Sequence, residues 1–201
     1  AFALLATRPA VRREVHVFTD LQQHEWSRSA GVARAPHRTS IVVHRIAGAP
    51  EQAANVTLLE NREAQGYTRA ANQGMRQSKA DYVILLNSDT VVTTGWLERI
   101  LECGESDPRT GIIGPVSNNA TWQSVPKVIE NGAWAENPLP DWMSVEDMER
   151  LVAELADGKF PEFPLPCGFC FAIKRAVIDS IGYPDEDKYP RGYGEENDYS
   201  F

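Results

Sequence analysis

The sequence predicts an α/β fold in which a mainly parallel central sheet carries helices on both faces. Stretches rich in Val and Ile alternate with stretches of helical periodicity, as expected for a parallel sheet with helical connections. Asp81–Leu86 is an almost continuous apolar run bounded by turn-forming residues, which is typical of a strand buried on both sides. The length of 201 residues allows a sizeable buried core.

The strands are expected where Val, Ile and other apolar residues gather. They cover 14–18, 39–46, 56–59, 81–86, 112–116 and 169–173. Ligands of such sheets bind beyond the carboxyl ends of the strands. The residues directly after Leu86 are therefore the first place to look for chemistry.

Helices are expected between these strands. The first covers 68–78, and a second, amphipathic helix covers 96–103 and ends at Gly104. A short helix over 174–181 is stopped by Gly182.

The composition changes between residues 117 and 166, where Trp and Pro residues gather. Within this segment Ser144 can cap a helix, Asp147 supplies the reciprocal capping carboxylate, and Gly158 is placed to end the helix. The apolar face of that helix is expected to consist of Met148, Leu151, Val152 and Leu155.

The charge balance limits the classes of partner. A net charge of −8 argues against broad attraction to nucleic acid or anionic lipid. The longest apolar runs are far too short to span a bilayer, and residues 1–6 lack the charged start and cleavage site of a secretory signal. We therefore expect a cytoplasmic protein, with peripheral association at the inner face of the membrane left open.

The cysteines point to packing more than to chemistry. Cys167 and Cys170 match the C-x-x-C spacing, but they lie in the apolar run 165–173 and not at a helix N-terminus, where a redox thiolate would be stabilised. A zinc site would need a second ligand pair, and none is spaced to supply it. Two packed thiols are the favoured interpretation.

A carboxylate follows the central strand directly. Asp89 cannot keep its charge in the core, so it must face solvent, a cation or a metal. Mg²⁺ and Mn²⁺ prefer oxygen ligands and often bind through one or two carboxylates plus phosphates. Asn87 offers a neutral amide for a ribose or a phosphate. The alternative is that Asn87–Asp89 simply forms a turn.

The end of the chain concentrates negative charge. Glu195, Glu196 and Asp198 follow Gly192 and Gly194 closely. Such a run is usually a solvated acidic turn. The functional alternative is that glycine lets the backbone approach a substrate while a carboxylate above it acts as a general base.

Several motifs in the right order resemble the family 2 glycosyltransferases. That family's pattern runs N-x-G-x-x-x-A-x-N-x-G, then a strand, then D-x-D or N-x-D. Ala71–Gly74 and Leu85–Thr90 match it closely, whereas Asn61 and Gly66 stand further apart than usual. Stretches that look like those of bacterial members are Gly95–Leu97, Gly114–Asn118 and Trp122–Pro126. Phe163–Ile173 resembles the acceptor-side segment of the same family.

The resemblance implies a GT-A fold, a Rossmann-like sandwich, and an inverting transfer of a sugar from a UDP-, GDP- or dTDP-sugar to a glycan, lipid-linked or protein acceptor. It implies Mg²⁺ or Mn²⁺ on Asp89. The implied donor-binding residues are Asn61, Gly66, Asn72, Asn87, Ser88 and Asp89.

The same resemblance assigns the catalytic and acceptor roles. Alignment on the family's E-D pair places the general base on Glu196, with Glu195 as a close second and Asp198 as a supporting acid. Acceptor-binding residues would be Gly168, Phe169 and Trp122. Trp122, Trp134 and Trp142 either stack on sugar rings or pack a helix over the sheet.

The resemblance covers about residues 55–201, a transferase core that is expected to be incomplete at its C-terminus. Residues 1–54 are atypical, since Thr19 and Asp20 lead into a stretch that looks more like part of a von Willebrand factor A-like domain. The alternative to an enzyme is a non-catalytic domain of transferase-like fold that binds a glycan or a partner. A nucleotidyltransferase is disfavoured because the basic signature for a triphosphate is missing.

Overall fold

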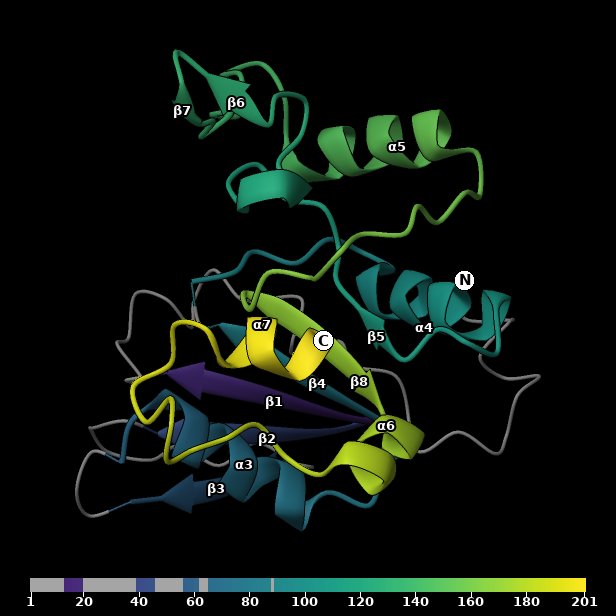
Figure 1. Ribbon diagram of the computed structural model, residues 1–201. Coiled ribbons are helices and arrows are strands. Elements are labelled where there is room, and N and C mark those ends of the chain that lie inside the picture. The colour runs from purple at the N-terminus through teal and green to yellow at the C-terminus, as the bar shows by residue number, and fades with distance from the viewer. Residues whose placement is uncertain (1–12, 20–38, 46–55, 62–64, 88) are drawn as a thin grey trace.

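The computed structural model describes residues 13–19, 39–45, 56–61, 65–87 and 89–201 (Figure 1). Its centre is a six-stranded sheet with the order β3-β2-β1-β4-β8-β5. The strands are β1 (Arg13–Thr19), β2 (Thr39–Arg45), β3 (Val56–Glu60), β4 (Tyr82–Asn87), β5 (Ile112–Ile113) and β8 (Cys170–Lys174).

The sheet is mixed in direction. The pairs β2–β3, β1–β2 and β1–β4 are parallel, whereas β8 is antiparallel to both of its neighbours, β4 and β5. The reason is the path of the chain. It leaves the carboxyl edge of the sheet after β5 and returns to that edge before β8, so β8 must run back in the opposite direction. The α/β class expected from the sequence is confirmed, and the antiparallel β8 is a feature that the sequence did not reveal.

Alternate side chains of β4 enter two different cores. Tyr82, Ile84 and Leu86 pack on one face against helix α4 (Trp96–Ser106). Val83 and Leu85 point to the other face. There they meet helices α3 (Tyr67–Gln77), α6 (Arg175–Ile181) and α7 (Glu195–Ser200) through Ala71, Met75, Ile178 and Tyr199. This alternation fixes the register of the strand whose end carries Asn87.

Helix α4 does not end where the sequence predicted. It continues past Gly104 to Ser106. A Cβ on Gly104 would lie 2.6 Å from the Tyr82 hydroxyl, so this glycine permits close packing of the helix on the sheet. Strand β5 is also shorter than expected and stops before Gly114, where an added Cβ would meet Pro166 at 2.7 Å. In both places a close approach of the chain explains the glycine.

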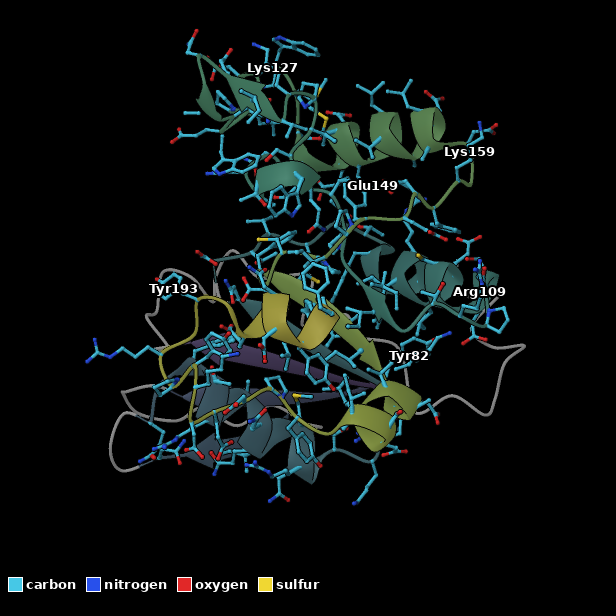
Figure 2. The ribbon with its side chains drawn as sticks, in the orientation of Figure 1. Tyr82, Arg109, Lys127, Glu149, Lys159 and Tyr193 are labelled. Atoms are coloured by element: carbon cyan, nitrogen blue, oxygen red, sulfur yellow. The ribbon has the colours of Figure 1, made fainter. Side chains whose placement is uncertain are left out.

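Residues 117–166 form a lobe that projects from the carboxyl edge of the sheet (Figure 1). It contains the short helix η2 (Thr121–Gln123), strands β6 (Ile129–Glu130) and β7 (Ala133–Trp134), and helix α5 (Val145–Ala156). An ion pair of 2.6 Å between Arg99 of α4 and Glu149 of α5 ties the lobe to the body, with Glu149 beneath α5 in Figure 2.

The capping box predicted for α5 is confirmed. Ser144 accepts from the amide of Asp147, and the Asp147 carboxylate accepts from the amide of Ser144. The helix ends at Asp157 in left-handed conformation, directly before Gly158. Its expected apolar face is not buried, since Leu155 is 77% exposed. Among the described residues, no helix is long and apolar enough to cross a membrane.

Candidate active site

The end of β4 is joined to the turn that precedes β8. The amide of Asn87 donates to the carbonyl of Phe169 at 2.9 Å, and the Thr90 hydroxyl reaches the same carbonyl at 3.5 Å. The amide of Thr90 also donates to the carbonyl of Asn87, so these residues do form a turn. Asp89 is exposed on that turn. The turn that the sequence offered as one alternative is therefore present, and Asp89 is exposed on it.

The C-terminal acids arrive at the same place. A Cβ on Gly168 would lie 3.7 Å from the Glu196 carboxyl carbon, so the Glu196 side chain lies against Gly168. Gly168 precedes Phe169, which bonds to Asn87. The chain of contacts from Asn87 through Phe169 and Gly168 to Glu196 brings together segments more than a hundred residues apart.

Glu196 is held in a defined position. It is half-buried in the first turn of α7, and its Oε2 accepts from the amide of Gly194 at 3.2 Å. Gly194 has φ 119°, a conformation that few side-chain-bearing residues adopt. The glycine therefore sets the direction from which the backbone reaches the carboxylate.

The side chain of Glu195 is buried in the interior. Its side chain is 7% exposed, and among the described residues its Oε2 has no hydrogen-bond partner. Desolvation, with a contribution from the charge of Glu196, raises the pKa of Glu195 to about 7. Tyr67 lies close by, and burial together with these two carboxylates raises the pKa of its hydroxyl well above the usual range. The two adjacent glutamates thus have different environments, as different roles require.

Asp198 interacts with neighbouring residues of the same chain. It forms an ion pair with Lys188 at 2.7 Å and accepts from the Tyr189 hydroxyl at 3.3 Å. The hydrogen bond from Lys188 is the main cause of the lowered pKa of Asp198. A carboxylate held ionised in this way is a poor proton acceptor, which disfavours Asp198 as a general base.

The connection 183–194 is fastened to helix α3. Asn72 is fully buried and donates to the carbonyl of Pro184 at 2.8 Å and to the Glu186 carboxylate at 2.7 Å. The ion pairs Arg76–Glu186 (3.0 Å) and Arg69–Asp187 (3.1 Å) and a hydrogen bond from the Thr68 hydroxyl to the Tyr189 carbonyl add to this attachment. Near the C-terminal end of this connection, the exposed Tyr193 projects outward (Figure 2).

The remaining expected donor residues also have contacts within the chain. Asn61 donates to Gln73 at 2.9 Å. A Cβ on Gly66 would lie 1.9 Å from the carbonyl oxygen of Pro190, so the close approach at this glycine involves the connection 183–194. Ser88 and Asp20 lie outside the described residues.

Two tryptophans of the lobe form an aromatic pair. The rings of Trp122 and Trp134 meet edge to face with centroids 5.1 Å apart, and Trp122 is 40% exposed. The neighbouring Gln123 donates to the carbonyl of Pro115 at 2.7 Å and accepts from the amide of Cys167. The pair is therefore anchored next to the turn that carries Gly168. Trp142, 79% exposed, does not pack over the sheet.

Two contributors went unnoticed in the sequence. Tyr67 lies one residue before the predicted helix 68–78, and the sequence assigned no role to it. Gln123 lies in the family-like stretch Trp122–Pro126, but only the fold shows that it bridges two loops.

The oxygen atoms that the site offers suit a hard divalent cation that is bound mainly by the phosphates of a substrate. Asp89 offers exposed carboxylate oxygens at the edge of the sheet. No group of three or more His, Cys, Asp or Glu side chains that could hold a metal occurs in the described part of the chain. A single carboxylate completed by phosphate oxygens is a usual arrangement for Mg²⁺.

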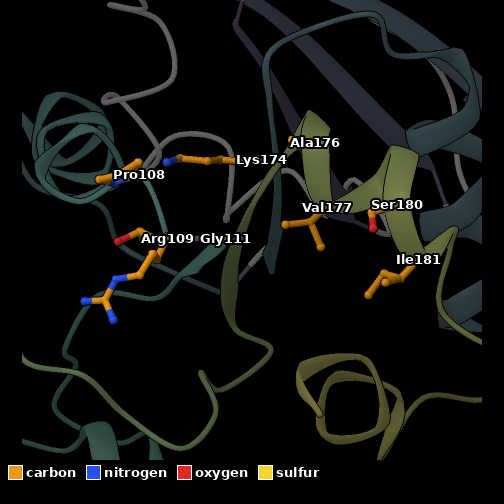
Figure 3. A pocket seen from close by; sticks show the side chains of 9 residues that line it. Pro108, Arg109, Gly111, Lys174, Ala176, Val177, Ser180 and Ile181 are labelled. Carbon is orange, nitrogen blue, oxygen red and sulfur yellow. The ribbon is translucent and has the colours of Figure 1, made fainter.

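A pocket of about 280 Å³ lies elsewhere (Figure 3). Arg109, Lys174 and Ser180 are among its lining residues. Lys174 pairs with Tyr82 at the start of β4, which is the opposite end of that strand from Asn87. The pocket is therefore separate from the candidate active site.

The cysteines are free thiols, and Cys170 is buried. Burial raises the pKa of Cys170 to about 12, which suits a packed and unreactive side chain.

A mixed α/β sheet with carboxylates gathered at its carboxyl edge places the chain among proteins similar to GT-A glycosyltransferases. The sequence model of the family "Glycosyl transferase family 2" matches residues 38–182, more than half of the chain. The chain belongs to this family. No curated protein sequence matches it.

Two solved structures are similar in fold. One is the mannosyltransferase PcManGT from Pyrobaculum calidifontis in complex with GDP-Man and Mn²⁺, with a TM-score of 0.57 and 16% identity over 94% of this chain and 50% of that one. The other is S. aureus TarS 1-349, with a TM-score of 0.59 and 14% identity over 94% of this chain and 54% of that one. The chain thus spans about half the length of these structures.

Proposed function

We propose that this chain carries the catalytic core of an inverting glycosyltransferase, which moves a sugar from a nucleotide-sugar to a glycan, lipid-linked or protein acceptor. The observation that carries the proposal is the contact of Glu196 with Gly168, one residue from the carbonyl that binds the end of β4. This contact brings a candidate base to the strand end that carries Asp89. Family membership and the two structural neighbours support the same class of reaction.

Glu196 is our proposed general base. Its half-buried carboxylate is fixed by one backbone amide, which leaves acceptor capacity for a proton. In a single displacement the acceptor oxygen forms a bond to the anomeric carbon while the bond to the diphosphate breaks. The acceptor proton moves to Glu196, and the nucleoside diphosphate departs from the opposite face.

Asp89 would hold the divalent cation, together with the phosphates of the donor. Such an ion stabilises negative charge on a leaving diphosphate. The complex of PcManGT with GDP-Man and Mn²⁺ supports an ion of this kind, Mg²⁺ or Mn²⁺. Asn87 is proposed to contact the donor beside it. We propose a structural role for Asn72, because the hydrogen bonds of its buried amide go to its own chain.

The acceptor is proposed to enter between the Gly168 turn and the lobe. Gly168 places no side chain against the Glu196 carboxylate. The half-exposed Trp122 is the neighbour of Gln123, which accepts a hydrogen bond from the amide of Cys167 beside Gly168. Aromatic faces pack well on the C–H faces of sugars. The side chain of Phe169 packs against the core, so its contribution would come from its backbone.

The test is a screen of UDP-, GDP- and dTDP-sugars with Mn²⁺, Mg²⁺ or EDTA, with released nucleotide as the readout. We expect one class of donor to be turned over only with the cation, and D89A to abolish this turnover while the protein stays folded. D141A, which changes an exposed aspartate of the lobe, is the matched control. Full activity of D89A in EDTA would refute the metal assignment, and donor binding without any turnover would favour a non-catalytic binding domain.

A further inference from the structure

The buried carboxyl group of Glu195 has no counter-charge. Its side chain is 7% exposed, and within the described part of the chain its Oε2 accepts no hydrogen bond. A buried carboxylate in this state would retain a large desolvation cost. A protonated carboxyl group would not, provided that its O–H finds an acceptor.

The groups around Glu195 offer one such acceptor. Gly192 approaches it with no side chain of its own, its hypothetical Cβ lying 3.5 Å from the Glu195 Oε1. From α3 comes Tyr67, whose own environment includes Cys170 of β8. From α7 comes the adjacent Glu196, whose charge and hydrogen bond to Glu195 contribute to the raised pKa of Glu195. None of these titratable neighbours is a cation, so nothing among them favours an ionised Glu195.

We propose that Glu195 is a positioning residue, which stays protonated while Glu196 is ionised and donates its O–H to the Glu196 carboxylate. This inference rests on the proposed function, because it gives the proposed base a second fixed contact. The first contact is the amide of Gly194, at 3.2 Å. With both contacts in place the carboxylate has a fixed orientation against Gly168.

The pairing also sets which acid titrates first. Two adjacent carboxyl groups cannot both ionise easily, so the pair would hold one proton over a wide range of pH. The burial of Glu195 favours that proton on Glu195. The proton on Glu195 would not take part in the transfer itself.

The decisive experiment is a titration by NMR of protein labelled with ¹³C at the glutamate carboxyl carbon, without donor or acceptor. E195Q and E196Q assign the two signals. We expect Glu195 to titrate about two pH units or more above the ordinary glutamate value of about 4.3, and E196Q to move the titration of Glu195 to lower pH because it removes a neighbouring charge. E154Q, at an exposed glutamate of α5, is the matched control and leaves both signals in place. A Glu195 midpoint in the ordinary range, or an unchanged Glu195 midpoint in E196Q, would overturn the proposal.

A second comparison addresses positioning. E195Q keeps a hydrogen-bond donor, whereas E195L fills the space without one. We expect kcat to fall about tenfold further in E195L than in E195Q, with similar KM for the donor. Equal losses in the two variants would contradict the positioning role. Because the titration needs no turnover, it fails or succeeds independently of the proposed function.

Discussion

The Glu196 carboxyl group and Gly168 are in contact, with 3.7 Å between the carboxyl carbon and the position that a Cβ on the glycine would occupy. An alanine at 168 makes only an ordinary contact at this distance, whereas a larger side chain competes with the carboxylate for space. We expect G168A to retain most activity and G168L to lower kcat about a hundredfold or more. Kinetics of the two variants, with circular dichroism to verify folding, test this expectation. Equal activity of G168L and G168A would show that the glycine does not serve Glu196.

Removal of the proposed base should affect the rate more than binding. E196Q retains the size and polarity of the side chain but cannot accept the proton. We expect kcat to fall by about 10²–10⁴ with little change in the affinity for the donor. D198N, which disrupts the ion pair with Lys188, is expected to lose far less activity. A larger loss in D198N than in E196Q would reverse the two assignments.

The buried amide of Asn72 should matter for stability. N72L removes both donors and leaves the Glu186 carboxylate and the Pro184 carbonyl without them. We expect the free energy of unfolding to fall by about 1–3 kcal/mol, since the buried carbonyl of Pro184 loses its donor while the half-buried Glu186 keeps its ion pair with Arg76. Urea denaturation measures this change. N61L, which breaks one half-buried hydrogen bond to Gln73, is the milder comparison. Unchanged stability in N72L would remove the structural role that we give to this residue.

The raised pKa of Glu195 predicts a pH-dependent stability. The folded protein holds this proton up to a pKa of about 7, whereas an unfolded glutamate releases it near 4.3. The stabilising contribution is complete below pH 4 and is lost as the pH rises through 7, a loss of up to about 3 kcal/mol.

E195Q does not titrate, so its stability relative to wild type should rise between pH 4 and pH 8. Chemical denaturation of both proteins across this range tests the sign. A constant difference between the two would contradict the assignment.

The aromatic pair of the lobe should contribute to acceptor binding. W134A leaves Trp122 in place but removes the ring that meets it edge to face. We expect a higher KM for saccharide acceptors and an unchanged rate of donor hydrolysis. W142A removes a more exposed tryptophan of the same lobe and serves as the control. Equal effects of the two substitutions would argue against a specific role for the pair.

Local patterns predicted the frame well, because each depends on neighbouring residues. The apolar run of β4, the capping box of Ser144 and Asp147, and the stop at Gly182 all appear as expected. The direction of β8 did not follow, because it depends on where the chain re-enters the sheet after fifty residues in the lobe.

The sequence indicated which segments contribute to the candidate site, but it did not indicate the environment of each glutamate. Motif order indicated that Asp89 and Glu196 belong to one site. The sequence could not separate Glu195 from Glu196, because only the packing of α7 on Tyr67 and Gly168 buries one and leaves the other open. A motif shows residue type and spacing but not which way an amide faces, so the hydrogen bonds of the Asn72 amide nitrogen to Pro184 and Glu186 did not follow from the sequence.

The attachment of the connection 183–194 to α3 has a consequence for protein engineering. The connection is attached to that helix by hydrogen bonds of the buried Asn72 and by the ion pairs of Arg69 and Arg76. It leads directly into α7. A chimera that takes residues 183–200 from another transferase would contain a connection that lacks its matching contacts with α3. Exchanging α3 together with 183–200 as one unit should preserve the position of Glu196. Exchanging either part alone should displace that carboxylate.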